Sequence, residues 1–260
     1  MTRARSASEW TRRSVLATAA AALLSACGLG AAKRAAGPKR PPVTTTTVVP
    51  TTTTTAAPTG PATYVANGSR SGKGVALTFH GSGDVALTQQ LLTEARQQSA
   101  PITIFGVGTW LEANPTMAHQ ILAAGHTLGN HTYDHPDLGS LDAGAVADEI
   151  QHCATILDQL EGDNGHWFRP SGIVVPTSFI LEQAGLAGYP VSVGYDIDPL
   201  DYQDPGPSVI VQRVSAALRP GSIVSLHTGH AGTVQAFGAL VELIRSRGLT
   251  PVLIGDLIKA

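Results

Sequence analysis

The chain has 260 residues, of which 43% are hydrophobic, so one large or two small domains could bury a sizeable core. Residues 1–40 hold eight basic residues and one acid, which leaves nine basic and eighteen acidic residues, a net charge of −9, in 41–260. An acidic globular part argues against a nucleic-acid-binding protein, because binding to phosphates needs a basic surface. The only cysteines, Cys27 and Cys153, lie in such different settings that we expect no disulfide.

Residues 1–27 have the pattern of an export signal. Thr-Arg-Arg-Ser-Val-Leu at 11–16 contains a twin arginine, typical of the route that exports folded proteins, and an apolar run covers 15–24. Leu-Ser-Ala-Cys at 24–27 resembles a bacterial lipobox, in which Cys27 is lipid-modified and becomes the mature N-terminus. The apolar run is short for a membrane-spanning helix. We therefore predict a lipoprotein anchored at the outer face of the cytoplasmic membrane or in the cell envelope; the alternative is that Cys27 is a buried thiol in a signal peptide cleaved elsewhere.

Residues 28–61 are predicted to be a disordered linker. Most of 41–55 is Thr, Pro and Val, with no helical or strand period that could bury one face. Segments of this composition stay extended and solvated. In polyproline geometry, at about 3.1 Å per residue, the linker would reach roughly 100 Å. This length suits a tether from a lipid anchor into a cell wall.

From residue 62 to the end, short apolar runs alternate with amphipathic stretches, which predicts one α/β domain over 62–260. The predicted strands cover 75–79, 102–107, 127–130, 167–168, 190–193, 222–226 and 251–254. The predicted helices cover 87–98, 115–124, 143–160, 176–184, 208–218 and 234–247. Cys153 falls on the apolar face of the third helix and is predicted to be a core residue. Such alternation indicates a parallel sheet, and seven or eight units favour a distorted (β/α) barrel over an open sheet.

Chemically versatile side chains gather where the predicted strands end. They are His80, His131, Arg169, the stretch 196–201 and His227. In a (β/α) barrel the carboxyl ends of all strands meet at one mouth, which is where active sites are built. This convergence favours an enzyme.

His131 and His135 stand four residues apart in the stretch His-Thr-Tyr-Asp-His. At this spacing on a helical turn, two imidazoles point to the same side and can bind one cation. Neutral imidazole is the commonest protein ligand for zinc and similar metals. The pair alone could equally be two surface histidines at a turn, so the metal interpretation depends on the rest of the chain.

Four stretches carry a family resemblance. They read His-Thr-Tyr-Asp-His at 131–135, Phe-Arg-Pro-Ser-Gly at 168–172, Tyr-Asp-Ile-Asp-Pro-Leu-Asp-Tyr at 195–202, and Arg-Pro-Gly-Ser-Ile-Val-Ser-Leu-His at 219–227. In this order they resemble the motifs of the polysaccharide deacetylase family, also called the NodB-homology family or carbohydrate esterase family 4. The third departs from its motif because tyrosines stand in place of both tryptophans.

The resemblance implies a metal-dependent hydrolase that removes N-acetyl, or sometimes O-acetyl, groups from a cell-wall or related glycan, acting on carbon–nitrogen bonds other than peptide bonds. His131 and His135 would bind the divalent metal, with zinc favoured and cobalt, nickel or manganese as alternatives. His227 would be the general acid, oriented by Asp201, and Tyr195 would line the pocket. The backbone near Gly172 would stabilise the oxyanion, and Arg169 would tune the base by its charge. Without the resemblance, Arg169 could be a structural ion pair, Asp201 a turn cap and His227 a core histidine.

The first motif departs from the family. Where the family has Thr-Phe-Asp-Asp-Gly, with a catalytic base followed by a metal ligand, this chain has Thr-Phe-His-Gly-Ser-Gly-Asp at 78–84. We expect a rearranged site, in which Asp84 supplies the missing metal-binding carboxylate and His80 serves as base or ligand. The alternative is a lost site on a non-catalytic glycan-binding lipoprotein of the same fold. A hydrolase of a non-sugar amide is a third possibility. In each case we expect a monomer that contacts the membrane only through its lipid.

Overall fold

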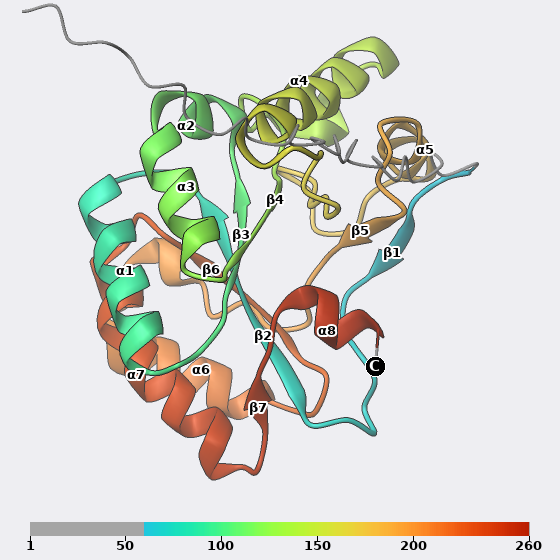
Figure 1. The fold of residues 1–260 in the computed structure, drawn as a ribbon. Coiled ribbons are helices and arrows are strands. Elements are labelled where there is room, and N and C mark those ends of the chain that lie inside the picture. The colour runs from blue at the N-terminus through green and yellow to red at the C-terminus, as the bar shows by residue number, and fades with distance from the viewer. Residues whose placement is uncertain (1–59, 260) are drawn as a thin grey trace, which may run out of the picture. The chain divides into compact units, whose positions relative to one another are not determined.

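The computed structural model describes residues 60–259 (Figure 1). The predicted signal segment, Cys27 and most of the predicted linker lie outside these residues. The strands are β1 (Thr63–Val65), β2 (Gly74–Gly81), β3 (Thr103–Gly106), β4 (Thr127–Asn130), β5 (Val191–Val193), β6 (Ile223–His227) and β7 (Thr250–Pro251). The α-helices are α1 (Val85–Gln97), α2 (Gly108–Ala113), α3 (Pro115–Ala123), α4 (Ala143–Glu161), α5 (Ser178–Leu186), α6 (Pro207–Ala217), α7 (Ala231–Ser246) and α8 (Ile254–Lys259). None of these helices is long and apolar enough to cross a membrane.

All paired strands run parallel. The order in the main sheet is β4-β3-β2-β6, with β7 beside the start of β2, and β1 pairs with β5. Single bridges made by Phe168 connect β4 to β5, and a bridge from Ile197 extends the β6 edge. The prediction of an α/β fold with a parallel sheet bent into a distorted (β/α) barrel is therefore confirmed.

Alternation along β2 separates the core from the site. Leu77 and Phe79 belong to the cluster that packs against α1 and α7, and Phe79 meets Phe237 of α7 with ring centroids 6.2 Å apart. Successive strand residues face opposite sides of a sheet, so Thr78 and His80 face the barrel interior. Figure 1 shows α1, α6 and α7 side by side along the outside of this part of the sheet. The same residues that build the helix-facing core therefore turn His80 inward.

Three helix ends are fixed by capping residues, one of which, Asp84, was expected to bind the metal. Asp84 is the N-cap of α1 and accepts hydrogen bonds from the backbone N–H groups of Ala86 and Leu87. Asp142 caps α4 in the same way, and Gly162 ends α4 in the left-handed conformation, which glycine adopts without steric cost. Loss of such a cap costs about 1 kcal/mol. These caps hold α1 and α4 against the strands that carry the candidate site.

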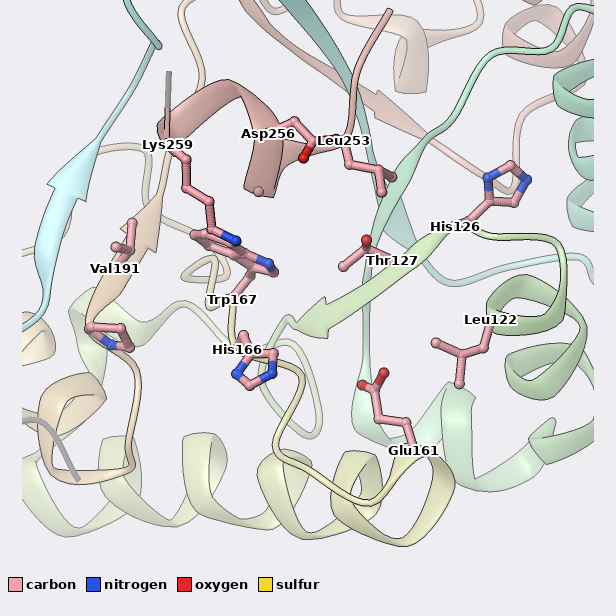
Figure 2. Close-up of a pocket in the computed structure, with 12 residues that line it drawn as sticks. Leu122, His126, Thr127, Glu161, His166, Trp167, Val191, Leu253, Asp256 and Lys259 are labelled. Atoms are coloured by element: carbon pink, nitrogen blue, oxygen red, sulfur yellow. The ribbon is translucent and has the colours of Figure 1, made fainter. Parts of the chain in front are cut away.

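The C-terminal segment differs from its prediction. The apolar run at 251–254 was expected to be a strand, but β7 covers only Thr250–Pro251 and α8 begins at Ile254. The apolar residues of this segment are still buried, but from a helix: Ile254 and Leu257 of α8 pack against Ala76 and Phe105. A cavity of about 550 Å³ lies beside α8, at the end of the sheet where β4 and β5 begin (Figure 2).

Candidate functional site

The parallel register brings three histidine-bearing strand ends together. His80 at the end of β2 pairs directly with His227 at the end of β6, and β4 ends at Asn130, next to His131. The imidazoles of His80 and His227 are stacked with centroids 4.5 Å apart. The strand-end residues predicted to converge thus lie at one mouth of the barrel.

His80, His131 and His135 form a three-histidine group. Their candidate ligand nitrogens all lie within 4.8 Å of one another. The Nε2 atom of His131 is central, 2.7 Å from Nδ1 of His80 and 3.1 Å from Nε2 of His135. Three imidazole nitrogens bound to one zinc at about 2.0–2.1 Å would be roughly 3.4 Å apart. Nε2 of His131 lies about 0.7 Å closer to His80 and about 0.3 Å closer to His135 than this, so the three rings fit a divalent metal after shifts of that size.

Hydrogen bonds around the group favour lone pairs that point inward. Nδ1 of His131 lies 2.9 Å from the carbonyl oxygen of Arg169, which can only accept, so Nδ1 carries the proton and Nε2 has the lone pair. Nε2 of His80 lies 2.9 Å from Oγ of Ser225. When Nε2 of His80 donates to this hydroxyl, Nδ1 also turns a lone pair toward His131. Two facing lone pairs repel each other unless a cation lies between them, and outer partners of this kind orient metal-binding histidines.

Burial keeps the inner two histidines neutral. Desolvation, followed by the charges of His131 and Arg169, lowers the pKa of His80 well below its ordinary value. Desolvation and the neighbouring His135 lower the pKa of His131 well below its ordinary value. Since a protonated imidazole cannot bind a metal, both rings are held in the ligand form.

These pKa shifts predict that the metal-free protein loses stability in mild acid. In the unfolded chain both histidines take up protons below a pKa of about 6.5, while the folded chain resists protonation until lower pH. Folding stability should therefore fall as pH drops below 6.5, by up to about 1.4 kcal/mol per pH unit for each of the two rings. Glu161 opposes this trend, because burial, with a contribution from Asp163, raises its pKa to about 7.

Denaturant midpoints measured with a chelator at pH 7.5 and 5.5 test this expectation. In the Glu161→Gln variant, which removes the opposing group, the loss at pH 5.5 should be larger. Equal stability at both pH values in that variant would contradict the assignment of buried neutral histidines.

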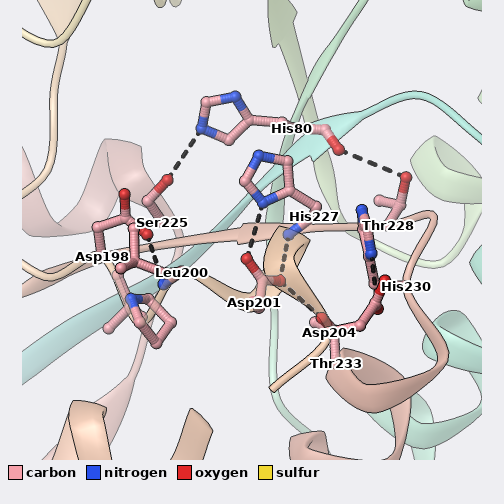
Figure 3. A network of polar contacts seen from close by, with 12 residues as sticks. His80, Asp198, Leu200, Asp201, Asp204, Ser225, His227, Thr228, His230 and Thr233 are labelled. Atoms are coloured by element: carbon pink, nitrogen blue, oxygen red, sulfur yellow. Dashed lines mark hydrogen bonds and ion pairs between the residues drawn. The ribbon is translucent and has the colours of Figure 1, made fainter. Parts of the chain in front are cut away.

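Asp201 and the partly exposed His227 form a hydrogen-bonded dyad beside the three-histidine group (Figure 3). Oδ1 of Asp201 accepts from Nδ1 of His227 at 2.8 Å, and Oδ2 accepts the backbone N–H of His227 at 2.8 Å and the hydroxyl of Thr233 at 2.6 Å. The carboxylate of Asp201 is fully buried. These three donors fix the orientation of the carboxylate, and it in turn fixes the proton of His227 on Nδ1, which leaves Nε2 free to accept or deliver a proton.

Arg169 is buried in the barrel and has no carboxylate partner among the described residues 60–259. Its guanidinium donates to the carbonyl oxygens of Val193 and Gly194 and to Oγ1 of Thr78, and it lies 4.2 Å from the centroid of the Phe105 ring. Burial lowers its pKa to about 9. Within residues 60–259 it forms no ion pair, and Nη1 is buried without a hydrogen-bond partner. The ion pair that the sequence allowed for Arg169 is thus absent among these residues. The family motif has an aspartate at the position of His80, and in this chain the guanidinium has a neutral imidazole near it instead.

The structure corrects the expected place of Asp84. Its carboxylate caps α1, with Oδ1 2.7 Å from the N–H of Ala86, and it lies outside the three-histidine group. His80 takes the third place there. Gly81, at the position of the family's ligand aspartate, belongs to β2, and a Cβ atom at Gly81 would lie only 2.6 Å from Cγ2 of Ile104. The Gly-rich turn therefore does not bring Asp84 back to the metal position, because strand pairing continues through Gly81 and helix capping engages Asp84.

His131 and His135 meet through a loop, not on the helical turn that their spacing suggested. Thr132 and His135 adopt left-handed backbone conformations, with φ values of 66° and 62°. The Glu149 carboxylate accepts the N–H groups of Tyr133 at 2.8 Å and Asp134 at 2.9 Å, which holds this loop open. Glu149 is thus a supporting residue that the local sequence pattern did not reveal.

Tyr195 and Gly172 are the remaining residues that the sequence placed in the site. The ring of Tyr195 is 6.3 Å from that of His80 and 5.4 Å from the guanidinium of Arg169, so it does line the mouth. Gly172 has a φ of 69° and packs against Asp137, where a side chain would overlap the backbone. Sequence reasoning missed Ser225 and Thr233. Ser225 could have been found, because it is a polar residue within an apolar strand, two positions before His227 and on the same face.

Comparisons with known proteins point to one family for this chain. The polysaccharide deacetylase family profile matches residues 67–191. A chitooligosaccharide deacetylase from Bradyrhizobium sp. (strain ANU 289) is 32% identical over 198 residues, covering 70% of this chain and 88% of the relative. A peptidoglycan-N-acetylglucosamine deacetylase from Bacillus cereus is 30% identical over 214 residues, covering 78% and 95%.

Solved structures share the fold. The Bc1960 peptidoglycan N-acetylglucosamine deacetylase superposes with a TM-score of 0.71 at 25% identity, over 76% of this chain and 93% of that one. A CE4 family pseudoenzyme from Bacillus anthracis also gives a TM-score of 0.71, at 23% identity, over 75% of this chain and 68% of that one. The shared fold, the matched profile and the identity across most of the relatives' length lead to one conclusion: this chain belongs to the polysaccharide deacetylase family.

Proposed function

We propose that the chain is a metal-dependent deacetylase that removes N-acetyl groups, or O-acetyl groups, from a cell-wall polysaccharide. The observation that carries the proposal is the three-histidine group stacked directly against the Asp201–His227 dyad. One part can bind a Lewis acid and the other can move a proton, and hydrolysis of an acetyl group needs both. The family relatives, whose names describe deacetylation of chitooligosaccharide and peptidoglycan, support the substrate class.

His80, His131 and His135 would hold the metal, and an all-imidazole set favours zinc over the harder magnesium or calcium ions. When bound, zinc would polarise the acetyl carbonyl and lower the pKa of a bound water. This arrangement excludes His80 as the general base. Because Nδ1 of His80 points into the group and Nε2 is engaged by Ser225, neither nitrogen is free to act as the general base.

We infer that His227 performs both proton transfers. With Nδ1 held by Asp201, Nε2 of His227 can take a proton from the attacking water and later deliver it to the leaving amine nitrogen. The same proton thus travels from water to amine, and no net charge is left on the protein. Arg169 contributes a fixed positive charge in the barrel interior, and Tyr195 borders the mouth.

A non-catalytic glycan-binding role is the second candidate. It is favoured by the composition of the three-histidine group, which contains no carboxylate within the described residues, and by the filled space around Gly81. In this reading the mouth would bind glycan without turnover.

Acetate release separates the two candidates. The purified full chain, stripped of metal and then reloaded with one zinc, cobalt, nickel or manganese ion, is incubated with N-acetylglucosamine oligomers and with peptidoglycan. We expect release that depends on metal and is lost on chelation. No release with any of the four ions, together with retained oligomer binding by calorimetry, would select the non-catalytic role.

Asp201→Asn should lower the rate of acetate release by about 10–100-fold while leaving metal binding intact. Asp201 now accepts three hydrogen bonds, and the N–H group of the asparagine amide would face one of these donors. The amide would therefore no longer fix the proton of His227 on Nδ1. Acetate release and metal content are measured together. Asp196→Asn is a matched control, because Asp196 bonds to Arg70, Ser222 and the N–H of Ile223 away from the three-histidine group. A wild-type rate in Asp201→Asn would remove the dyad from the mechanism.

We also propose that the domain acts outside the cytoplasm on a lipid anchor, as the twin-arginine and lipobox patterns predict. Radiolabelled palmitate incorporation into the wild type, and its loss in Cys27→Ser, would test the anchor. A Cys27→Ser protein that remains lipid-labelled would contradict it.

A further inference from the structure

A second concave site lies at the end of the barrel away from the three-histidine group. Its cavity, of about 550 Å³, is bordered by Thr127 at the start of β4, Val191 at the start of β5 and Gly255 in α8. The candidate metal group follows the opposite end of β4. From Thr127 to His131 the extended chain advances four residues at about 3.3 Å each, roughly 13 Å. The mechanism described above uses none of the residues that line this cavity.

The wall combines an aromatic ring with apolar side chains. Trp167 is half-buried, Val191 and Leu253 also line the cavity, and Leu122 lines the side opposite the indole (Figure 2). Gly255 lets α8 approach the indole closely, since a Cβ atom there would already lie 3.3 Å from Cζ2 of Trp167. A cavity of this size and composition is typical of small-ligand sites, in which a few polar groups fix the orientation.

Glu161 supplies the polar group. It is the last residue of α4, and its carboxyl group points into the cavity (Figure 2). Its Oε1 atom is buried and has no hydrogen-bond partner among residues 60–259. A buried carboxyl oxygen without a partner is costly to the fold, so a ligand or an ordered water that satisfies it is expected.

The state of this carboxyl group restricts the ligand. Burial raises the pKa of Glu161 to about 7, so near neutral pH a large fraction is protonated and can both donate and accept a hydrogen bond. Lys259 also lines the cavity and offsets one of the two carboxyl groups, those of Glu161 and Asp256, so the lining carries little net charge and favours neither an anion nor a cation. A neutral ligand with hydroxyl or amide groups and one apolar face fits better, because it can bond to Glu161 while its face lies on Trp167.

We propose that this cavity binds one sugar unit of a neutral glycan, with Trp167 as the platform and Glu161 as the polar contact. The proposal does not depend on hydrolysis at the other end of the barrel. A polysaccharide presents the same unit many times, so a second binding site keeps the protein on the polymer while the first site is empty. Two weak sites on one repetitive ligand give a combined affinity well above either alone.

Indole N–H signals in NMR spectra of the full chain test the proposal. The chain has three tryptophans, Trp10, Trp110 and Trp167, so the Trp167 signal can be assigned by its loss in Trp167→Leu. An N-acetylglucosamine tetramer is titrated in the presence of a chelator, which prevents turnover. We expect the Trp167 signal to shift saturably, and Glu161→Leu, which removes both polar atoms of the side chain, to weaken this binding by about 10-fold.

Glu182→Leu is the matched control, because Glu182 is exposed on α5 and does not line the cavity. It should titrate as the wild type does. Acetate release from a short oligomer should be unchanged in Glu161→Leu. A Trp167 signal that does not move, or one whose titration is the same in Glu161→Leu and wild type, would overturn the proposal. The titration can be read even if no acetate is ever released, so the two proposals fail separately.

Discussion

His131→Ala should abolish stoichiometric metal binding and lower acetate release by more than about 100-fold, a larger loss than removal of a supporting partner causes. The reason is geometric: Nε2 of His131 is the only one of the three candidate ligand atoms known to lie within 3.1 Å of both others. Without it, His80 and His135 lose their common neighbour. Metal content by mass spectrometry and acetate release are the measurements.

Two further variants control for a loss of metal binding that has another cause. His119→Ala removes an exposed histidine from α3 and should bind metal as the wild type does. His131 is fully buried, so its loss could also disturb the fold; His135→Ala, at an exposed position, should lower metal affinity without this complication. Full metal occupancy in both His131→Ala and His135→Ala would exclude the three-histidine group as the metal site.

Gly81→Asp, which restores the residue of the family motif, should destabilise the fold by about 3 kcal/mol or more and should not strengthen metal binding. A Cβ atom at Gly81 would lie 2.6 Å from Cγ2 of Ile104 and 3.1 Å from both the carbonyl oxygen of Phe105 and Cα of Gly106. The last two contacts are to backbone and cannot move away without breaking the β2–β3 pairing. Denaturant midpoints and metal titrations measure the two effects.

Gly144→Asp is the matched control for the glycine-to-aspartate change. Gly144 is exposed in the first turn of α4, where a Cβ atom would meet nothing closer than 3.6 Å, so stability should change by no more than about 0.5 kcal/mol. Ile104→Ala removes the closest contact, so its cost in the Gly81→Asp background should be smaller than its cost in the wild type. A Gly81→Asp protein with wild-type stability and tighter metal binding would show that the end of β2 can accept the family carboxylate.

Periodicity predicted the elements that bury a continuous apolar face. The strand at 127–130 and the helices that became α3, α4 and α6 agree with the structure to within a residue or two at each end. β1 and α8 were missed because neither is long enough to show a period: β1 has three residues, and α8 continues an apolar run that resembles a strand. Short elements at the rim of a barrel are fixed by tertiary contacts, such as those of Leu257 with the interior cluster.

The site was predictable as far as strand order and residue type determine it. His80, His131 and His227 had to meet, because parallel strands end at one mouth. Which of Asp84 and His80 completes the group could not be read from the sequence, since it depends on whether the turn after residue 80 bends back. The structure shows strand pairing to Gly81 and a capped helix from Val85, and these two local preferences decide the question in favour of His80.

The contact between His80 and Ser225 spans 145 residues of sequence, and the register that creates it pairs β2 with β6. Closing so long a loop costs more chain entropy than closing a short one, so we expect this contact to form after the more local ones. The contact between His80 and His131 spans only 51 residues and needs the pairing of β2, β3 and β4 alone. We therefore expect the three histidines to meet before β6 supplies Ser225, so that the last contact to form is the one that fixes the orientation of the His80 ring.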